Sequence, residues 1–368
     1  MPLRTDALRH LRRWLPVLAV LAAACSPEHY PQTALRPISD FARIGDDLQT
    51  KTFWWAFAVF VLVEGALVYA IFRFRGKPTD AEPRQVHGNT TIEIVWTVIP
   101  ALILAFIAVP TVRGIFETAA IPGGDALKVQ VIGHQWWWEF RYPDLGITTA
   151  NEVHIPVGQT VSFRMGTADV VHSFWPPRFA GKRDVFPNRE TRLWFKAEEA
   201  GEYPGQCAEF CGIQHGRMAF RVKAQTAEEF QSWVAHMQTL KATPPAPAGP
   251  SPDSAPRAPG KPPEQGPPAP PSAVAAATTA GEKLFLAKGC VGCHSLNAVN
   301  APKGMIGPNL ANVGARSFIG AGSFKNTDEN LARWIQNPQL MKEGVLMPNL
   351  GVSPEDAKSL VAYLRAHQ

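Results

Sequence analysis

The stretch GQCAEFCGIQHGRM, residues 205–218, carries four side chains that bind soft metal ions. Cys207 and Cys211 lie four residues apart, and His215 and Met218 follow them closely. A disulfide between the cysteines is possible in a loop, but it would leave the histidine and the methionine without a role. Zinc takes thiolate and imidazole ligands, and a thioether is not among its usual ligands. Thiolate, imidazole and thioether together favour copper.

The second cysteine distinguishes this stretch from a mononuclear blue-copper site, which uses one cysteine, two histidines and a weak axial methionine. Two thiolates can bridge two metal ions, so the stretch predicts a dinuclear copper site. Such a site needs one more imidazole, and our candidate is His172, a polar residue in the apolar and aromatic segment ADVVHSFWPP. A lone histidine there would more often be only hydrogen-bonded. With no obvious open position for a substrate, we expect the site to transfer electrons.

The second motif is CVGCH, residues 290–294. In an exported protein this pattern attaches c-type haem through thioethers from Cys290 and Cys293, with His294 as an axial ligand. Zinc would require further cysteines or histidines, and no cysteine follows in the sequence. A redox dithiol would normally lie in a βαβ pattern, which is absent here. The motif therefore predicts covalent haem.

The sixth iron ligand of such a haem should be a methionine well downstream. Met347, in KEGVLMPNL, has the Met-Pro context typical of class I cytochromes c, whereas Met305 and Met341 lack it. Methionine ligation raises the haem potential, which suits a donor of electrons to copper. We therefore predict Met347 as the second axial ligand.

Two apolar segments must anchor these motifs to a membrane. Residues 52–72 and 92–112 are each long enough to span a hydrocarbon core of about 30 Å. The loop between them holds more lysine and arginine than aspartate and glutamate, and positive charge marks the cytoplasmic side. Both flanks of this hairpin, which we assign to residues 26–120, should therefore lie outside the cytoplasm.

Residues 1–25 have a basic start, an apolar run and a small-residue end, which predicts an export signal. Cys25 follows three alanines and is close to a bacterial lipoprotein cleavage box. We expect this cysteine to be lipidated; the alternative is a spare residue near a cleavage site.

The rest of the chain divides into three parts. In residues 121–241, short segments rich in Val, Phe, Trp and Thr alternate in polarity, which predicts an all-β sandwich or barrel. A helix over 226–240, capped by Thr226, should close this unit. Residues 242–280 are rich in Pro and Ala and predict an extended linker. Residues 281–368 predict a second, all-α unit.

The composition argues against a nucleic-acid partner. The formal net charge is +5, but lysine and arginine are scattered, and no basic stripe carries interleaved aromatic residues. We expect ordinary surface charge and contact with membrane lipid instead.

The copper stretch, together with DVVHSFW, closely resembles the dinuclear CuA site of cytochrome c oxidase subunit II. In that family both cysteines bridge the metals and each copper takes one histidine. The resemblance implies a cupredoxin-like β domain and a set of copper ligands, namely His172, Cys207, Glu209 through its backbone carbonyl, Cys211, His215 and Met218. It also implies a second role for Glu209, whose side chain would reach a magnesium ion at the boundary with subunit I.

The resemblance extends from the first apolar segment to about residue 240. In HGNTTIEIVWTVIP, Glu93 matches an acid at the mouth of a proton-input path; the alternative is an interfacial carboxylate with no proton role. GHQWWWEF resembles the aromatic stretch beside the copper, in which Trp136 would let electrons enter. Glu64, deep in the first span, requires a partner or a protein-facing position, and its role stays open.

These features together resemble subunit II of a haem–copper oxidase with a fused class I cytochrome c, the caa3 type. The resemblance implies that electrons pass from haem c to CuA and then to haem a in subunit I, where O2 is reduced to water and protons are pumped. It implies subunits I and III as partners, reduced cytochrome c or a bc1 complex as donor, and the bacterial inner membrane as location, with both redox domains on the periplasmic side. The alternative is the CuA subunit of another reductase, such as a nitric oxide reductase.

Overall fold

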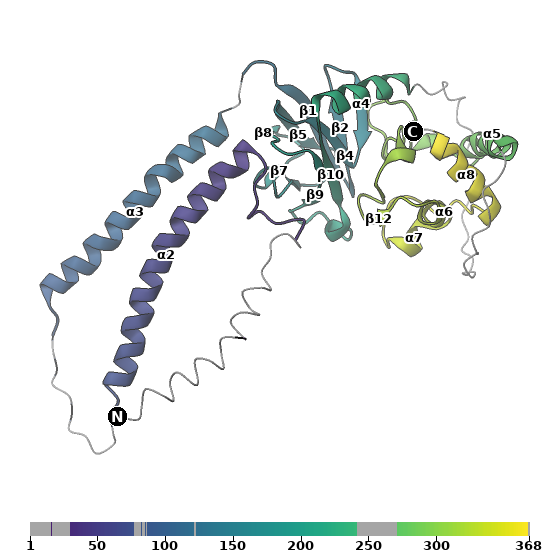
Figure 1. Cartoon of the computed structure of the whole chain (residues 1–368). Coiled ribbons are helices and arrows are strands. Elements are labelled where there is room, and N and C mark those ends of the chain that lie inside the picture. The colour runs from purple at the N-terminus through teal and green to yellow at the C-terminus, as the bar shows by residue number, and fades with distance from the viewer. Residues whose placement is uncertain are drawn as a thin grey trace.

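The computed structural model describes residues 16, 30–76, 82, 85, 87–120, 123–240 and 271–366, with side chains from residue 278 onward in the last range. These residues form a pair of long helices, a β domain and a helical C-terminal domain (Figure 1). The predicted export signal apart from residue 16, Cys25 included, and residues 242–270 of the predicted linker lie outside the described residues.

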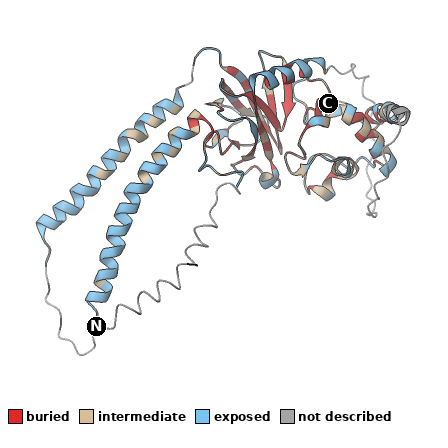
Figure 2. Cartoon of the chain, viewed as in Figure 1, coloured by how far each residue is buried: buried red, intermediate tan, exposed pale blue. Residues whose placement is uncertain are grey.

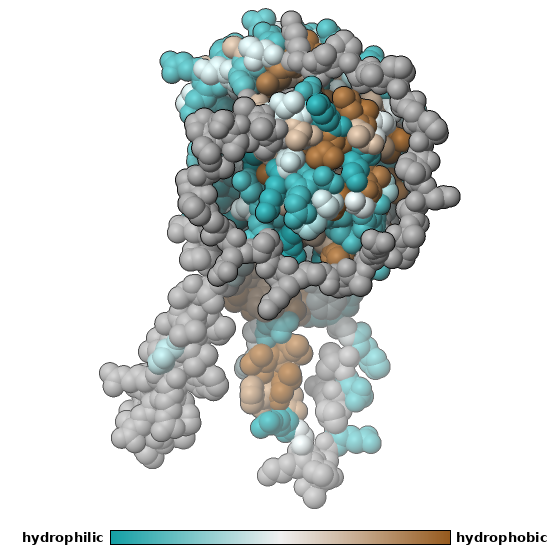
Figure 3. Space-filling view, turned by 90° about the vertical axis from the view of Figure 1, so that its right-hand side faces the viewer, coloured by the Kyte–Doolittle hydropathy of each residue, from teal (hydrophilic) through white to brown (hydrophobic). Residues whose placement is uncertain are grey.

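The two long helices are α2 (Asp40–Arg73) and α3 (Thr90–Ala119). Each begins with a side-chain cap, from Ser39 and Asn89 respectively, which accepts hydrogen bonds from the first turn. Both helices are long and apolar enough to cross a membrane, and the predicted spans lie within them. Their side chains are exposed (Figure 2), and the part that projects from the globular region is hydrophobic between hydrophilic ends (Figure 3).

The start of α2 and the end of α3 both lie against the same side of the β domain (Figure 1). Just before α2, the Ile38 amide donates to the carbonyl of Arg178 at 3.0 Å. At the end of α3, the indole of Trp194 donates to the carbonyl of Thr118 at 3.2 Å. The end of α2 at Arg73 and the start of α3 at Thr90 therefore lie remote from the β domain (Figure 1).

The β domain is a sandwich of two five-stranded sheets, ordered β3-β2-β1-β5-β8 and β4-β10-β9-β6-β7. Most neighbours are antiparallel, whereas β1–β5 and β4–β10 are parallel. The strands are β1 (Leu127–His134), β2 (Trp137–Tyr142), β3 (Ile147–Ala150), β4 (Glu152–Pro156), β5 (Thr160–Thr167), β6 (His172–Trp175), β7 (Arg183–Val185), β8 (Thr191–Lys196), β9 (Gly201–Cys207) and β10 (Ala219–Gln225). This architecture confirms the predicted all-β unit.

Aromatic rings fill the space between the sheets because alternate residues of each strand point inward. Phe174 and Phe220 stack with ring centroids 4.4 Å apart, and Trp138 packs edge-on against both. Gly205 permits this arrangement, since a Cβ there would lie 2.2 Å from the Phe220 ring. These three rings are completely buried, and the strands of the β domain contain many of the buried residues of the chain (Figure 2). Phe174 pairs with Cys207 at the end of β9, so this aromatic core adjoins the copper loop.

The helix α4 (Ala227–Thr239) closes the β domain as predicted. Thr226 and Glu229 form the expected capping box at its start. On its inner face Trp233 stacks against His154 of β4, with ring centroids 4.3 Å apart.

The C-terminal domain is mainly helical, with two short 3₁₀ turns and one small hairpin. Its elements are α5 (Pro271–Ala287), η3 (Cys290–Gly292), η4 (Val313–Ala315), β11 (Phe318–Ile319), β12 (Phe324–Lys325), α6 (Asp328–Gln336), α7 (Pro338–Met341) and α8 (Pro354–Ala366). The predicted cap of α8 is present, because Ser353 accepts from the Asp356 amide at 3.1 Å. In contrast to the expected linker, which ends at residue 280, helix α5 already begins at Pro271.

Candidate functional site

The loop between β9 and β10 brings the two predicted thiols together. Cys207 is the last residue of β9. Its Sγ atom lies 3.7 Å from the Sγ atom of Cys211. Both side chains are buried and both thiols are free. A disulfide would require about 2.0 Å between the sulfurs. The arrangement instead leaves room for metal ions between two separate sulfur ligands.

The predicted nitrogen and thioether groups surround this sulfur pair. The Nδ1 atom of His172, at the start of β6, lies 3.8 Å from Cys207 Sγ, because β6 pairs with β9. On the other side, His215 Nδ1 lies 3.6 Å and Met218 Sδ 3.8 Å from Cys211 Sγ. The turn η2 (His215–Arg217) supplies His215, and Met218 follows this turn directly. The structure thus gathers the five predicted side chains, which are two thiols, two imidazoles and one thioether, around the sulfur pair. This arrangement fits a soft dinuclear metal site.

Glu209 presents its two ends in different directions. Its backbone carbonyl oxygen lies 3.3 Å from Cys207 Sγ, next to the sulfur pair. Its side chain is exposed to solvent. The residue can therefore offer a carbonyl to a metal at the cluster while its carboxylate faces outward.

The two thiols shift each other's pKa in opposite directions. The hydrogen bond from Cys211 lowers the pKa of the Cys207 thiol, and His172 adds to this effect, while burial opposes it. The same hydrogen bond, together with burial, raises the pKa of the Cys211 thiol. Since metal ligation requires thiolates, a raised pKa at Cys211 makes protons compete with a metal ion for this sulfur.

Asp169 orients His172, and the sequence interpretation missed it. Its Oδ1 lies 2.8 Å from His172 Nε2, and its Oδ2 accepts from the Gln135 amide at 2.7 Å. Burial raises the pKa of Asp169, but these hydrogen bonds outweigh it and the pKa is lowered. A carboxylate behind a ligating histidine fixes the ring orientation and tautomer. The available signal was an acidic residue three positions before the histidine.

Trp136 lies against the same loop. Its indole Nε1 donates to the carbonyl of Cys211 at 2.9 Å, and the Gln135 side chain donates to the same oxygen at 2.8 Å. Gly212 has φ +117°, and a Cβ there would lie 3.0 Å from the indole ring. Glycine is therefore needed at this position both for the backbone conformation and for the close approach of the ring.

The structure does not bring Glu93 to this site. Glu93 lies in the first turn of α3, at the end of the hairpin remote from the β domain (Figure 1). Glu64 lies exposed within α2. Neither carboxylate contributes to the cluster.

In the C-terminal domain, the CVGCH motif spans η3 and the residues directly after it. The Nδ1 atom of His294 lies 2.8 Å from the carbonyl of Pro308, which leaves Nε2 available for iron. A Cβ on Gly307 would lie only 2.5 Å from the imidazole. Residues 307 and 308 therefore pack directly against the imidazole of His294. Burial raises the pKa of the Cys290 thiol to about 11, opposite to the lowered pKa of a reactive dithiol.

The segment around Met347 is held by one side chain. The Gln339 amide donates to the carbonyls of Val345 and Met347, at 2.5 and 3.1 Å. Two large apolar side chains, Ile306 and Leu346, are 65% and 61% exposed, one in each of the segments that would flank a haem. A flat apolar group such as a porphyrin would cover them. The ligand role of Met347 stays a prediction.

A two-helix membrane anchor, a thiolate-rich metal site on a β-sandwich and a haem-attachment domain define a membrane-bound electron-transfer subunit with two redox domains. Comparison with known families agrees. Residues 39–113 match the family described as cytochrome c oxidase subunit II, transmembrane domain, and residues 146–225 match its periplasmic domain. Residues 278–368 match the cytochrome c family.

Individual relatives point the same way. Cytochrome c oxidase subunit 2 of Alkalihalophilus pseudofirmus is 37% identical, over 82% of this chain and 82% of the relative. The subunit 2 of Bacillus subtilis is 33% identical, over 81% of each chain. A crystal structure of the periplasmic domain of subunit II of cytochrome oxidase from Bradyrhizobium japonicum matches with 32% identity and a TM-score of 0.32, covering 33% of this chain and 98% of that one.

This chain therefore belongs to the cytochrome c oxidase subunit II family and carries a cytochrome c domain on the same polypeptide. The periplasmic domain of the family implies CuA copper, and the cytochrome c domain implies haem c. The predicted family, fold class and electron-transfer function are confirmed. The alternative, a subunit of a nitric oxide reductase, is not favoured by these relatives.

Proposed function

We propose that this chain is subunit II of a caa3-type oxidase and that it receives electrons at its own haem domain and passes them through its copper domain to haem a of subunit I. Reduction of O2 to water, coupled to proton pumping, takes place in that partner. The observation that carries the proposal is that two imidazoles and one thioether lie within 3.6–3.8 Å of the Sγ atoms of the two adjacent cysteines.

The proposed copper ligands are the residues that surround the sulfur pair: His172, Cys207, Glu209 by its carbonyl, Cys211, His215 and Met218. When bound, copper supplies a one-electron redox centre to this site. The protein's own contribution is rigidity, because the aromatic core below the loop and the Asp169–His172 hydrogen bond keep the ligands in place. Asp169 also holds the Nε2 proton of His172, so that Nδ1 faces the metal. Trp136, hydrogen-bonded to the Cys211 carbonyl, is the residue through which we propose that electrons enter.

In the haem domain, Cys290 and Cys293 would form the thioether links and His294 and Met347 the axial bonds. When bound, haem supplies the second one-electron centre. The carbonyl of Pro308 holds the Nδ1 proton of His294 and thereby orients the ring.

The contact with subunit I is proposed from the residues that are exposed to solvent near the copper loop. The Glu209 carboxylate and the neighbouring Phe210, which is 76% exposed, form a surface that suits subunit I. Glu209 would reach the magnesium ion at that boundary, and subunit III would complete the complex. Glu93, at the opposite end of the hairpin, would lie at the mouth of a proton path on the cytoplasmic side. We place the protein in the bacterial inner membrane, with reduced cytochrome c or a bc1 complex as donor.

Metal analysis of the purified full-length protein tests the copper assignment. We expect two coppers and one covalent haem per chain. Cys207→Ser should abolish the mixed-valence optical bands of copper and leave the haem spectrum unchanged, whereas Cys25→Ser, outside the ligand set, should leave both unchanged. Zinc at the site, or a disulfide between Cys207 and Cys211 in the mature protein, would overturn the proposal.

A further inference from the structure

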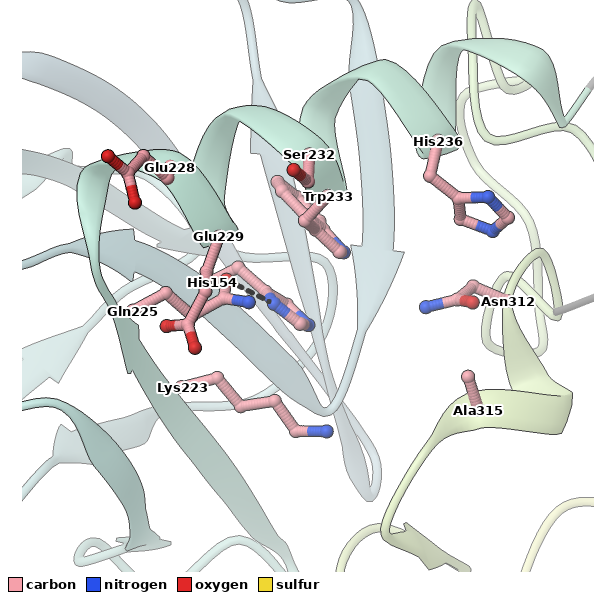
Figure 4. A pocket seen from close by; sticks show the side chains of 10 residues that line it. All are labelled: His154, Lys223, Gln225, Glu228, Glu229, Ser232, Trp233, His236, Asn312 and Ala315. Carbon is pink, nitrogen blue, oxygen red and sulfur yellow. Dashed lines mark hydrogen bonds between the residues drawn. The ribbon is translucent and has the colours of Figure 1, made fainter.

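The two redox domains are in direct contact, and the packing between them is closer in some parts of the interface than in others. In Figure 1, α7 and β12 lie on the side of the cytochrome domain that faces the β domain. Away from the copper loop, the domains leave a cavity of about 660 Å³. Figure 4 shows that His236 and Lys223 of the β domain face Asn312 across this cavity, and that the hydrogen bond drawn there joins two residues of the β domain. At the copper loop, in contrast to this cavity, the two domains pack closely.

Four consecutive residues of the cytochrome domain, 341–344, contact the copper loop. The Arg217 guanidinium donates to the Met341 carbonyl at 3.3 Å. The side-chain amide of Gln214 donates to the backbone carbonyl of Glu343. Gly344, with φ +81°, packs so closely on Ile213 that a Cβ there would lie 2.9 Å from that side chain. Segment 341–344 thus contacts the copper loop through hydrogen bonds and close packing along its length.

Lys342 is the central contact of this segment. Its side chain is almost fully buried, with 1% of the residue exposed. Its Nζ donates to the carbonyl of Arg217 in the β domain at 2.7 Å and to the carbonyl of Gly320 in the cytochrome domain at 3.0 Å. Burial, aided by the charge of Arg217, lowers the pKa of Lys342 to about 7. Burying an amine is unfavourable unless its hydrogen bonds are satisfied, so this position has a specific partner on each domain.

Both segments are adjacent to proposed redox ligands. Arg217 precedes Met218, Gln214 precedes His215, and segment 341–344 leads directly to Met347. Electron tunnelling weakens steeply with distance, so the orientation of these two loops governs the transfer rate. We propose that segment 341–344 is the surface by which the haem domain docks on the copper loop, and that Lys342 is the positioning residue that sets this docking for electron transfer. The inference rests on the proposed function.

A graded pair of substitutions in the assembled oxidase tests it. Lys342→Met keeps the length of the side chain but removes the hydrogen bonds of the amine to both carbonyls, which then keep only the Ser323 hydroxyl as a donor. Lys342→Gln keeps a side-chain donor for one of them. The rate of haem c to copper electron transfer after photoreduction of the haem is measured together with the optical spectra and potentials of both centres. We expect Lys342→Met to slow the transfer by about tenfold, equivalent to about 1.4 kcal/mol in the docking equilibrium. Lys342→Gln should lie between this variant and the unsubstituted protein.

The control is Lys358→Met, an exposed lysine on α8, which should transfer electrons at the normal rate. A normal rate in Lys342→Met, with both spectra intact, would overturn the positioning role. If Lys342→Met fails to fold, a normal rate in Lys342→Gln would overturn it equally. Loss of the copper bands in the unsubstituted protein would instead contradict the proposed function, so the two failures are distinguishable.

Discussion

Replacing Asp169 by asparagine should weaken copper binding without changing the ligands themselves. The carboxylate accepts from His172 Nε2 at 2.8 Å and from the backbone amides of Gln135 and Val170, each at 2.7 Å. An asparagine of the same shape has only one acceptor oxygen, so its NH2 group must face at least one of these donors. Either the imidazole loses its partner or a backbone amide does.

The size of the effect follows from the loss of one charge-assisted hydrogen bond behind a ligand. Removing such a partner of a metal-bound histidine typically lowers metal affinity about 10–100-fold. This corresponds to about 1.4–2.7 kcal/mol. The copper potential should also rise, because a negative charge that favours the oxidised site is removed.

The assay is a competition for copper between the purified protein and a chelator, followed by the mixed-valence absorbance. Asp169→Asn should give normal bands at saturating copper and a weaker apparent affinity. Asp184→Asn, at an exposed position of β7, serves as the control and should bind like the unsubstituted protein. Equal affinity of Asp169→Asn and the control would show that the carboxylate does not orient His172 and would refute the reasoning.

Three further predictions concern separate parts of the chain. Met347→Ala should convert the haem to high spin and lower its potential while Met341→Ala should not, as read from optical spectra; the reverse result would reassign the axial ligand. Gly307→Ala should perturb the haem spectrum because the added Cβ would lie 2.5 Å from the imidazole of His294; an unchanged spectrum would show that this segment does not hold the imidazole. Burial lowers the pKa of His154 from 6.5 to about 3, so the unfolded chain binds more protons between these values and stability is lost as the pH falls through this window. Between about pH 7 and about pH 5, the free energy of unfolding should fall by about 2 kcal/mol because of this histidine. Urea unfolding at the two pH values should show that this loss is absent in His154→Gln. An unchanged acid sensitivity in that variant would contradict the assignment.

The copper and haem motifs were predictable because their chemistry is local in sequence. Cys207, Cys211, His215 and Met218 occupy one loop, so their types and spacing alone restrict the metal. His172 was predictable only in combination with that loop, since pairing of β6 with β9 brings it to the site.

Residues that act through tertiary contact were not predictable from the pattern. Lys342 meets its carbonyl partner on Arg217 across 125 positions of sequence, and no periodicity indicates such a contact. The start of α5 was missed for a different reason. Proline content assigned residues 271–280 to the linker, whereas the run SAVAAATTA after Pro271 favours a helix, because alanine has the highest helix propensity and proline is tolerated in the first turn.

The cytochrome domain also completes the edge of one sheet in the β domain. β3 is the outermost strand of its sheet, and residues 298–300 of the cytochrome domain lie alongside it. The Thr148 amide donates to the carbonyl of Ala298 at 2.8 Å, and the Asn300 amide to that of Gly146 at 3.1 Å. A shortened chain that ends before α5 would therefore expose a bare strand, which is a template for pairing with other copies. By covering β3, the cytochrome domain would protect the β domain against aggregation, a role separate from electron transfer.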